Sequence, residues 1–80
     1  MAIKIFYQPN CPKCPKAKIL GKKLEELGYK VEYINAAEKP EEAARFLLMA
    51  TPSIVIEEEG KAKKIWSGFT PPIEEVKQYL

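Results

Sequence analysis

The chain has 80 residues, a length that predicts one small domain spanning residues 1–80. Hydrophobic residues make up 46% and charged residues 30%, as in ordinary globular proteins, and the formal net charge of +2 is too small for a dedicated nucleic-acid binder. The chain has no histidine and only two cysteines. This composition excludes Ser-His-Asp catalysis, Cys-His catalysis and mixed His/Cys zinc sites within one chain.

The ends and the apolar runs of the sequence predict where the protein works. No basic leader followed by a long apolar stretch opens the chain. The longest uncharged run, Phe46–Ile56, is interrupted by Pro52 and is shorter than the roughly 20 residues that a membrane helix needs. We therefore expect a cytoplasmic monomer with reduced thiols that binds neither membrane nor nucleic acid.

The first half of the chain predicts two strands that alternate with two helices. Ala2–Tyr7 is rich in apolar residues and predicts a buried strand. Residues Pro12–Leu27 predict a helix, because apolar residues spaced by three and four fall on one face: Ala17, Leu20, Leu24 and Leu27. Val31–Asn35 predicts a second strand. Pro40–Met49 predicts a short helix with proline in its first turn and with three residues facing inward: Ala43, Phe46 and Leu47.

The second half predicts a hairpin and a last helix. Ser53–Glu58 is a β-branched strand, and Glu59-Gly60 turns into a strand near Lys63–Trp66. Thr70 is expected to cap a helix that Pro71 begins and that the apolar residues Val76 and Leu80 anchor. The resulting β-α-β-α-β-β-α order predicts an α/β fold, with a four-stranded mixed sheet and helices on both faces.

The two cysteines form the motif Cys11-Pro12-Lys13-Cys14, directly after the first strand and at the start of a helix. A helix N-terminus leaves backbone N–H groups unpaired and carries about half a positive charge. A thiolate at Cys11 would accept those hydrogen bonds, which lowers its pKa. Cys14 lies within reach of a disulfide. We therefore expect Cys11 to attack and Cys14 to resolve the mixed disulfide.

Two alternatives to redox chemistry remain open for these cysteines. Two chains together could supply four thiolates to an iron–sulfur cluster or a metal ion, which visible absorbance or metal analysis would detect. The cysteines could also belong to a purely structural domain and never cycle, which thiol counting before and after mild reduction would reveal.

The positive charges gather near the cysteines. Six lysines and no acid occur up to Leu24. Lys13 and Lys16 fall in the first helical turn, where cations oppose the helix dipole. Two interpretations stand: their field lowers the pKa of Cys11 and attracts acidic partners, or they form part of a solvated lysine face.

Two further segments are candidates for substrate contact. Thr51-Pro52 opens a strand, where proline requires special geometry. A cis bond could place the Thr51 backbone beside the cysteines, although only about one X-Pro bond in twenty is cis and a trans proline that ends the helix is the simpler interpretation. Gly68 permits close approach of a ligand. Its neighbours Trp66 and Phe69 are expected to pack in the core or at its edge.

Together these residues resemble the thioredoxin superfamily, and in particular its small glutaredoxin-like branch. The similarity rests on C-P-K-C at 11–14, on Thr51-Pro52 at the usual cis-proline position and on Gly68 before the last helix. It implies a minimal thioredoxin fold, a cis Thr51–Pro52 bond and thiol-disulfide oxidoreductase activity that reduces protein disulfides. It also implies no cofactor beyond a Cys11–Cys14 disulfide, with substrate contacts at Pro12, Lys13, Thr51, Pro52 and Gly68.

Two subfamilies compete within this branch. Trp66–Pro71 resembles the W-S-G-F-x-P signature of NrdH-type redoxins, which thioredoxin reductase reduces and which donate electrons to ribonucleotide reductase. Cys11–Pro15 and Leu48–Pro52 resemble small archaeal glutaredoxin-like thioredoxins. Ordinary glutaredoxins hold glutathione with a Gly-Gly pair and acids before the last helix, whereas Ser67–Thr70 contains no acid. We therefore expect thioredoxin reductase as the reductant, with a glutathione-dependent glutaredoxin as the alternative.

Overall fold

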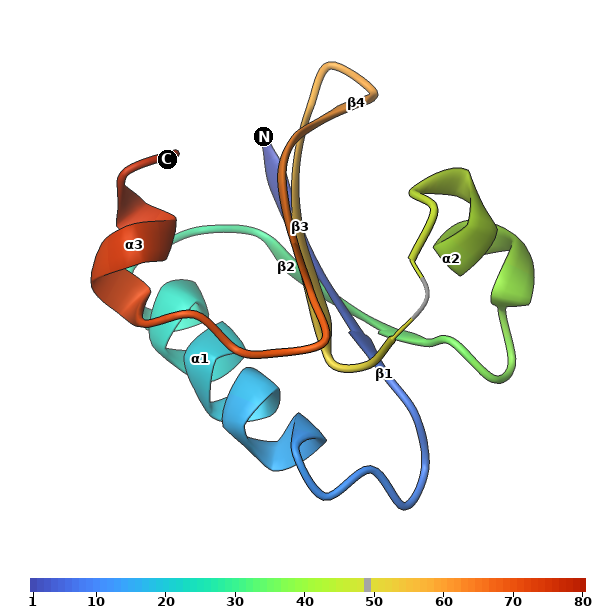
Figure 1. Ribbon diagram of the computed structural model, residues 1–80. Coiled ribbons are helices and arrows are strands. Elements are labelled where there is room, and N and C mark those ends of the chain that lie inside the picture. The colour runs from blue at the N-terminus through green and yellow to red at the C-terminus, as the bar shows by residue number, and fades with distance from the viewer. Residues whose placement is uncertain (49) are drawn as a thin grey trace.

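A computed structural model describes residues 1–48 and 50–80 of the chain. It contains four strands and three helices in the predicted β-α-β-α-β-β-α order (Figure 1). The elements are β1 (Ala2–Tyr7), α1 (Cys14–Glu26), β2 (Val31–Asn35), α2 (Pro40–Arg45), β3 (Ser53–Glu58), β4 (Lys61–Ser67) and α3 (Ile73–Lys77). None of the helices in these described ranges is long and apolar enough to cross a membrane.

The four strands form one mixed sheet in the order β2-β1-β3-β4. β1 pairs with β2 in parallel, because the crossover through α1 returns the chain in the same direction. β1 also pairs with β3 antiparallel, and β3 pairs with β4 antiparallel across the Glu59-Gly60 turn. The predicted sheet is therefore confirmed, and β1 lies in its interior.

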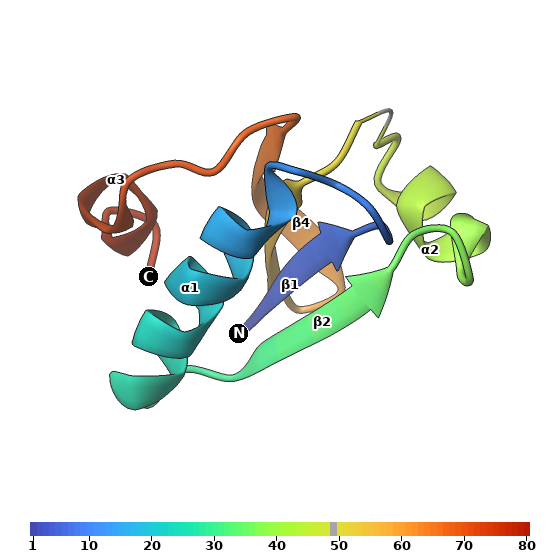
Figure 2. The same ribbon diagram turned by 90° about the horizontal axis from the view of Figure 1, so that it is seen from below.

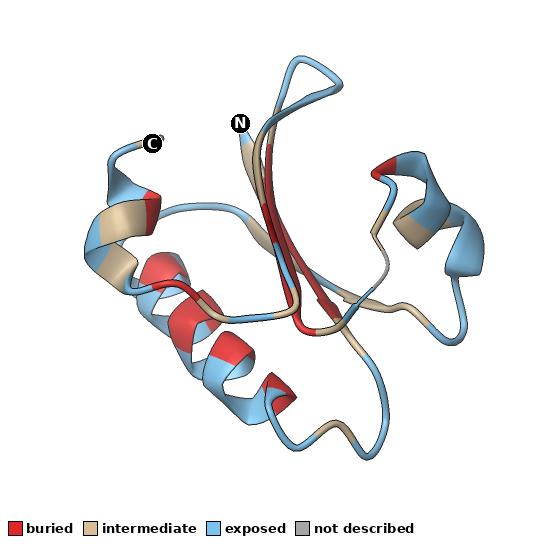
Figure 3. Ribbon diagram, viewed as in Figure 1, coloured by how far each residue is buried: buried red, intermediate tan, exposed pale blue. Residues whose placement is uncertain are grey.

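Alternation along the strands gives the sheet two apolar faces. Ile5 and Ile54 point to the side that α1 and α3 cover, whereas Phe6 and Val55 point to the side of α2 (Figure 1). The red segments of Figure 3 show that burial is concentrated in β1, β3 and the side of α1 that faces the sheet. Helices thus cover both faces, as the sequence predicts.

The start of α1 differs from its prediction. The helix begins at Cys14 with Lys13 as its N-cap, rather than at Pro12. Proline has no N–H, so Pro15 could not donate to the Cys11 carbonyl in a helix that began at Pro12. Instead the N–H of Cys14 donates to the Cys11 carbonyl at 3.3 Å, in a turn that precedes the helix. Pro15 then occupies the first helical turn, where a missing N–H costs nothing.

The predicted helix Pro40–Met49 ends early, at Arg45. Leu47 adopts a left-handed conformation with φ 57°, and its N–H donates to the Ala44 carbonyl at 3.0 Å. The N–H of Leu48 donates to the Ala43 carbonyl, also at 3.0 Å. This pattern is a Schellman motif, which usually has glycine at the left-handed position. Here that position is Leu47, so the sequence does not indicate where the helix ends. The end of the predicted helix at Met49 lies outside the described residues.

The predicted cap of the last helix is wrong. α3 begins at Ile73 with Pro72 as its N-cap, and the buried Thr70 hydroxyl has no hydrogen-bond partner among the described residues. Because Thr70 and Pro71 each precede a proline, both are disfavoured from helical geometry. The helix therefore cannot begin at Pro71, and it starts after Pro72.

Two leucines expected to face inward are exposed, and so is Phe69, which was expected in the core or at its edge. Leu27 is the C-cap of α1 and is 53% exposed, Leu47 is 86% exposed, and Phe69 is 51% exposed. Trp66 is buried as predicted, and its indole N–H donates to the Glu75 carboxylate. Periodicity alone does not show where a helix ends, so it assigns end residues such as Leu27 to the buried face.

One lysine lies inside the fold. Lys4, on β1, is only 8% exposed. Its Nζ lies 3.5 Å from Glu57 Oε1, 3.8 Å from Glu42 Oε2 and 3.9 Å from Glu32 Oε2. Three carboxylates from β2, α2 and β3 therefore compensate the buried cation, and this cluster attaches α2 to its face of the sheet.

The two leucines of α1 provide a matched test of the core. Leu24 is fully buried whereas Leu27 is 53% exposed. We expect Leu24→Ala to lower the free energy of unfolding by about 2–5 kcal/mol, because it leaves a cavity. Leu27→Ala should change it by only about 0.5 kcal/mol. Urea denaturation measures both, and equal losses would contradict this assignment of the core.

Candidate active site

The register of three neighbouring strands brings three loop segments to one end of the sheet. Phe6 pairs with Ser53, and Ser53 pairs with Ser67. The chain therefore leaves β1 towards Cys11, enters β3 from Pro52 and leaves β4 towards Gly68 at the same end. Figure 2 views the molecule from this end and shows the three connections beside one another.

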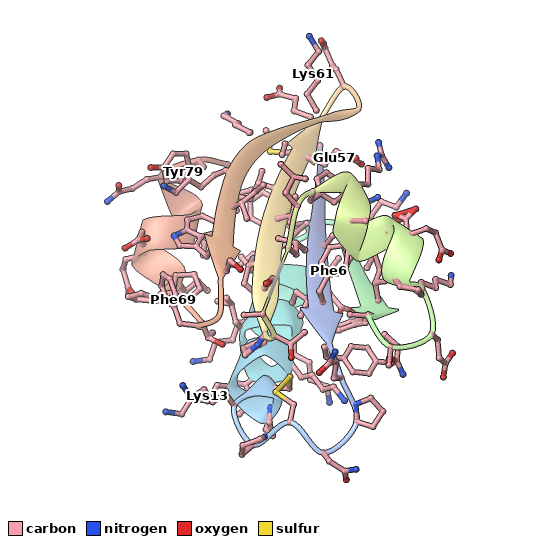
Figure 4. The ribbon with its side chains drawn as sticks, turned by 45° about the vertical axis from the view of Figure 1, so that its right-hand side comes forward. Phe6, Lys13, Glu57, Lys61, Phe69 and Tyr79 are labelled. Carbon is pink, nitrogen blue, oxygen red and sulfur yellow. A yellow bond between two sulfur atoms is a disulfide. The ribbon has the colours of Figure 1, made fainter. Side chains whose placement is uncertain are left out.

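Cys11 and Cys14 are joined by a disulfide, with their Cα atoms 5.4 Å apart, within the usual range for a disulfide. Figure 4 shows the bond at the start of α1, near Lys13. Cys14 is only 3% exposed, while Cys11 is partly exposed in the preceding turn. An external thiolate therefore reaches the Cys11 sulfur more easily, and attack there would release Cys14 as the leaving thiolate.

The Thr51–Pro52 peptide bond is cis, which confirms what the family resemblance implies. Pro52 is buried, and the Thr51 hydroxyl lies 3.9 Å from the Cys11 sulfur and 3.5 Å from Gln8 Oε1. The hydroxyl of Ser53 donates to the Ala50 carbonyl at 2.5 Å. Thr51 thus presents a hydroxyl directly to the more accessible sulfur.

Gly68 lies against the same proline segment. Its N–H donates to the Pro52 carbonyl at 2.9 Å, and its φ of 87° suits glycine. A Cβ added at Gly68 would lie 3.4 Å from the Ala50 Cβ. Gly68 therefore adjoins the proline loop.

The structure brings together most of the residues predicted for the site. Cys11, Cys14 and Thr51 are linked by the contacts described above, and the Pro52 carbonyl accepts a hydrogen bond from the Gly68 N–H. The remaining predicted residues are Pro12 and Lys13, which are exposed in the turn between the cysteines.

Sequence reasoning missed the site contacts of two residues. Gln8 directly follows the predicted strand Ala2–Tyr7 and carries no predicted role, but its side chain lies beside the Thr51 hydroxyl. Ser53 was assigned only to a strand, but its hydroxyl closes the turn before that strand. The only sequence feature that points to these residues is that each is polar and borders a buried strand. That feature cannot show that Gln8 contacts Thr51, which is 43 residues away.

The electrostatic surroundings of the disulfide are positive. The first turn of α1 contains no acid, and Lys13 makes no side-chain cap to the helix. Within residues 1–48 and 50–80 there is no group of three or more cysteine or carboxylate ligands placed to hold a metal ion. The groups that the structure brings together at this site are the two cysteines, the Thr51 hydroxyl and nearby lysines.

Comparison with known proteins identifies the family. The family described as "Thioredoxin domain" matches residues 1–80. The chain belongs to this thioredoxin family. It is 42% identical over 57 residues to a thioredoxin of Methanocaldococcus jannaschii, covering 68% of this chain and 67% of that protein. It is also 34% identical over 65 residues to the SPbeta prophage-derived thioredoxin-like protein YosR of Bacillus subtilis, covering 80% and 78%.

The solved structures agree on the fold. Thioredoxin 1 from Thermosipho africanus matches with a TM-score of 0.73 at 24% identity, covering 99% of this chain and 89% of that one. The predicted α/β thioredoxin-like fold is thereby confirmed. With the disulfide at the start of α1, the family assignment makes this protein a thioredoxin-type dithiol oxidoreductase whose redox pair is Cys11–Cys14.

Proposed function

We propose that the protein reduces disulfides in other proteins, with Cys11 as the attacking thiol and Cys14 as the resolving thiol. The unequal exposure of the two cysteines carries this proposal, because the partly exposed Cys11 can meet a substrate whereas Cys14, only 3% exposed, cannot. The nearby Thr51 hydroxyl can donate a hydrogen bond to a thiolate at Cys11.

The proposed reaction has two exchanges. In the dithiol form, the Cys11 thiolate attacks one sulfur of a substrate disulfide, forms a mixed disulfide and releases the first substrate thiolate. Cys14 loses its proton and attacks the Cys11 sulfur, which closes the Cys11–Cys14 disulfide and releases the second substrate thiolate. The substrate gains two electrons, the protein loses two, and the released thiolates take up protons.

Single cysteine substitutions test this assignment. Cys14→Ser should accumulate a mixed disulfide with a substrate peptide, because no internal thiol can resolve it. Cys11→Ser serves as the matched control and should form no such adduct, because its remaining thiol is buried. Mass spectrometry without reductant detects the adduct. Faster alkylation of Cys14 than of Cys11 in the reduced wild type at mildly acidic pH would contradict the assignment.

We also propose that a flavin-dependent thioredoxin reductase supplies the electrons, as the resemblance of Trp66–Pro71 to NrdH-type redoxins suggests. The turn before α3 supports this choice. It contains an exposed Phe69 and a half-buried Thr70, with no carboxylate between Ser67 and Thr70 to bind the amino end of glutathione. Ribonucleotide reductase is the corresponding candidate acceptor.

A coupled assay separates the two reductants. We expect faster turnover with NADPH and thioredoxin reductase than with glutathione and its reductase, because fixed hydrogen-bond partners for glutathione are missing. Both assays use the same peptide disulfide and follow NADPH oxidation, with Cys11→Ser as the blank. Equal or faster turnover with glutathione would restore the glutaredoxin alternative.

A further inference from the structure

The charges of this chain are distributed unevenly over its surface. We define the lysine surface as five exposed residues of α1 and its N-cap: Lys13, Lys16, Lys18, Lys22 and Lys23. The ion pairs in the described part of the chain involve other cations, namely Lys4, Lys30, Arg45 and Lys63. No residue of the lysine surface is among these ion pairs, so no carboxylate within ion-pair distance offsets its positive charge in the described part of the chain. Several cations elsewhere on the protein are offset in this way.

The two acids of α1 lie at the opposite end of the helix from Lys13 and Lys16. Glu25 and Glu26 lie in the last turn of the helix, far along the chain from the disulfide. Glu25 accepts a hydrogen bond from the Tyr33 hydroxyl at 2.6 Å. Lys18 lies over the Tyr7 ring, 4.5 Å from its centroid, and this contact leaves its charge in place.

Helix stability gives no reason for lysines at this end of α1. The positive end of the helix dipole favours acids in the first turn, yet that turn has no acid, contains Lys16 and follows Lys13 as the N-cap. The other two helices follow the rule, with Glu41 and Glu42 in the first turn of α2 and acids at the same place in α3. The exception thus occurs at the one helix that carries the redox disulfide.

We propose that the lysine surface guides acidic protein partners to the disulfide, so that the preferred substrates carry carboxylates beside their reactive cysteines. This inference rests on the proposed function and names its substrate class. The partly exposed Cys11 and the exposed Lys13 are two residues apart in the turn before α1, and Figure 4 shows Lys13 at the disulfide end of the molecule. An acidic rim around a disulfide would match this arrangement in charge.

Two peptide disulfides that differ only in charge provide the probe. Each contains one intramolecular disulfide, flanked in one peptide by three glutamates and in its twin by three glutamines. Pre-reduced protein is mixed with either peptide in a single turnover, so that no reductase is needed. At about 10 mM ionic strength, where screening is weak, we expect the acidic peptide to react about tenfold faster. At about 1 M salt, where the Debye length is roughly 3 Å, the two rates should converge.

Three double variants test where on the surface this effect arises. Lys13→Gln/Lys16→Gln should lower the ratio of acidic to neutral rates about three- to fivefold at low salt. Lys61→Gln/Lys63→Gln removes the same charge from the β3–β4 hairpin at the far end of the molecule, where Figure 4 shows Lys61, and should leave the ratio unchanged. Lys13→Arg/Lys16→Arg keeps the charge and should keep the ratio. Because each variant is judged by a ratio, changes in the reactivity of Cys11 itself cancel.

The outcomes distinguish this inference from the function on which it rests. If the protein reduces neither peptide, the proposed function fails. If it reduces both at equal rates at low salt, the function stands and the inference is overturned. Equal losses in the Lys13/Lys16 and Lys61/Lys63 variants would also overturn it, because net charge rather than a local surface would then explain the preference.

Discussion

The site depends on one constraint, the register in which β3 lies between β1 and β4. The pairs Phe6–Ser53 and Ser53–Ser67 align one end of each of the three strands at the same edge of the sheet. A shift of one residue in either pair would turn every side chain of a strand to the opposite face and move the Thr51–Pro52 segment away from Cys11. The two-sided burial of β1 and β3 makes such a shift costly, so core packing holds the redox site together.

α1 has two roles that conflict in part. Its buried side includes Cys14 and continues as the core through Ala17, Leu20 and Leu24, so the cysteine that we propose as the resolving thiol is a core residue. Its N-terminal end has lysines where stability favours acids. Under the mechanism we propose, positive charge at this end favours the thiolate of the attacking cysteine, at a cost to helix stability. Because a chain of 80 residues has only a small core, losing the stabilising effect of acids at this helix end matters for its stability.

The sequence predicted the parts of the fold that depend on repeated patterns. The order of elements, the bounds of β1, β2 and β3, and the cysteine pair at the start of a helix follow from periodicity and local motifs. Helix ends were less predictable, because Leu47 adopts a left-handed conformation that glycine normally signals. The cis bond before Pro52 could be expected only from the family resemblance. The contact of Gln8 with Thr51 depends on strand register, which no single segment encodes.

A redox titration tests most directly whether Cys11 and Cys14 form one reversible couple. The protein is equilibrated in buffers with different ratios of oxidised to reduced dithiothreitol, quenched with acid, alkylated and weighed by mass spectrometry. We expect a single transition between a form with no alkylated thiol and a form with two, following a two-electron couple in which about 30 mV changes the equilibrium constant tenfold. Cys14→Ser should show no such transition. A wild-type protein that keeps two free thiols, or an intact disulfide, across the whole range would contradict the account.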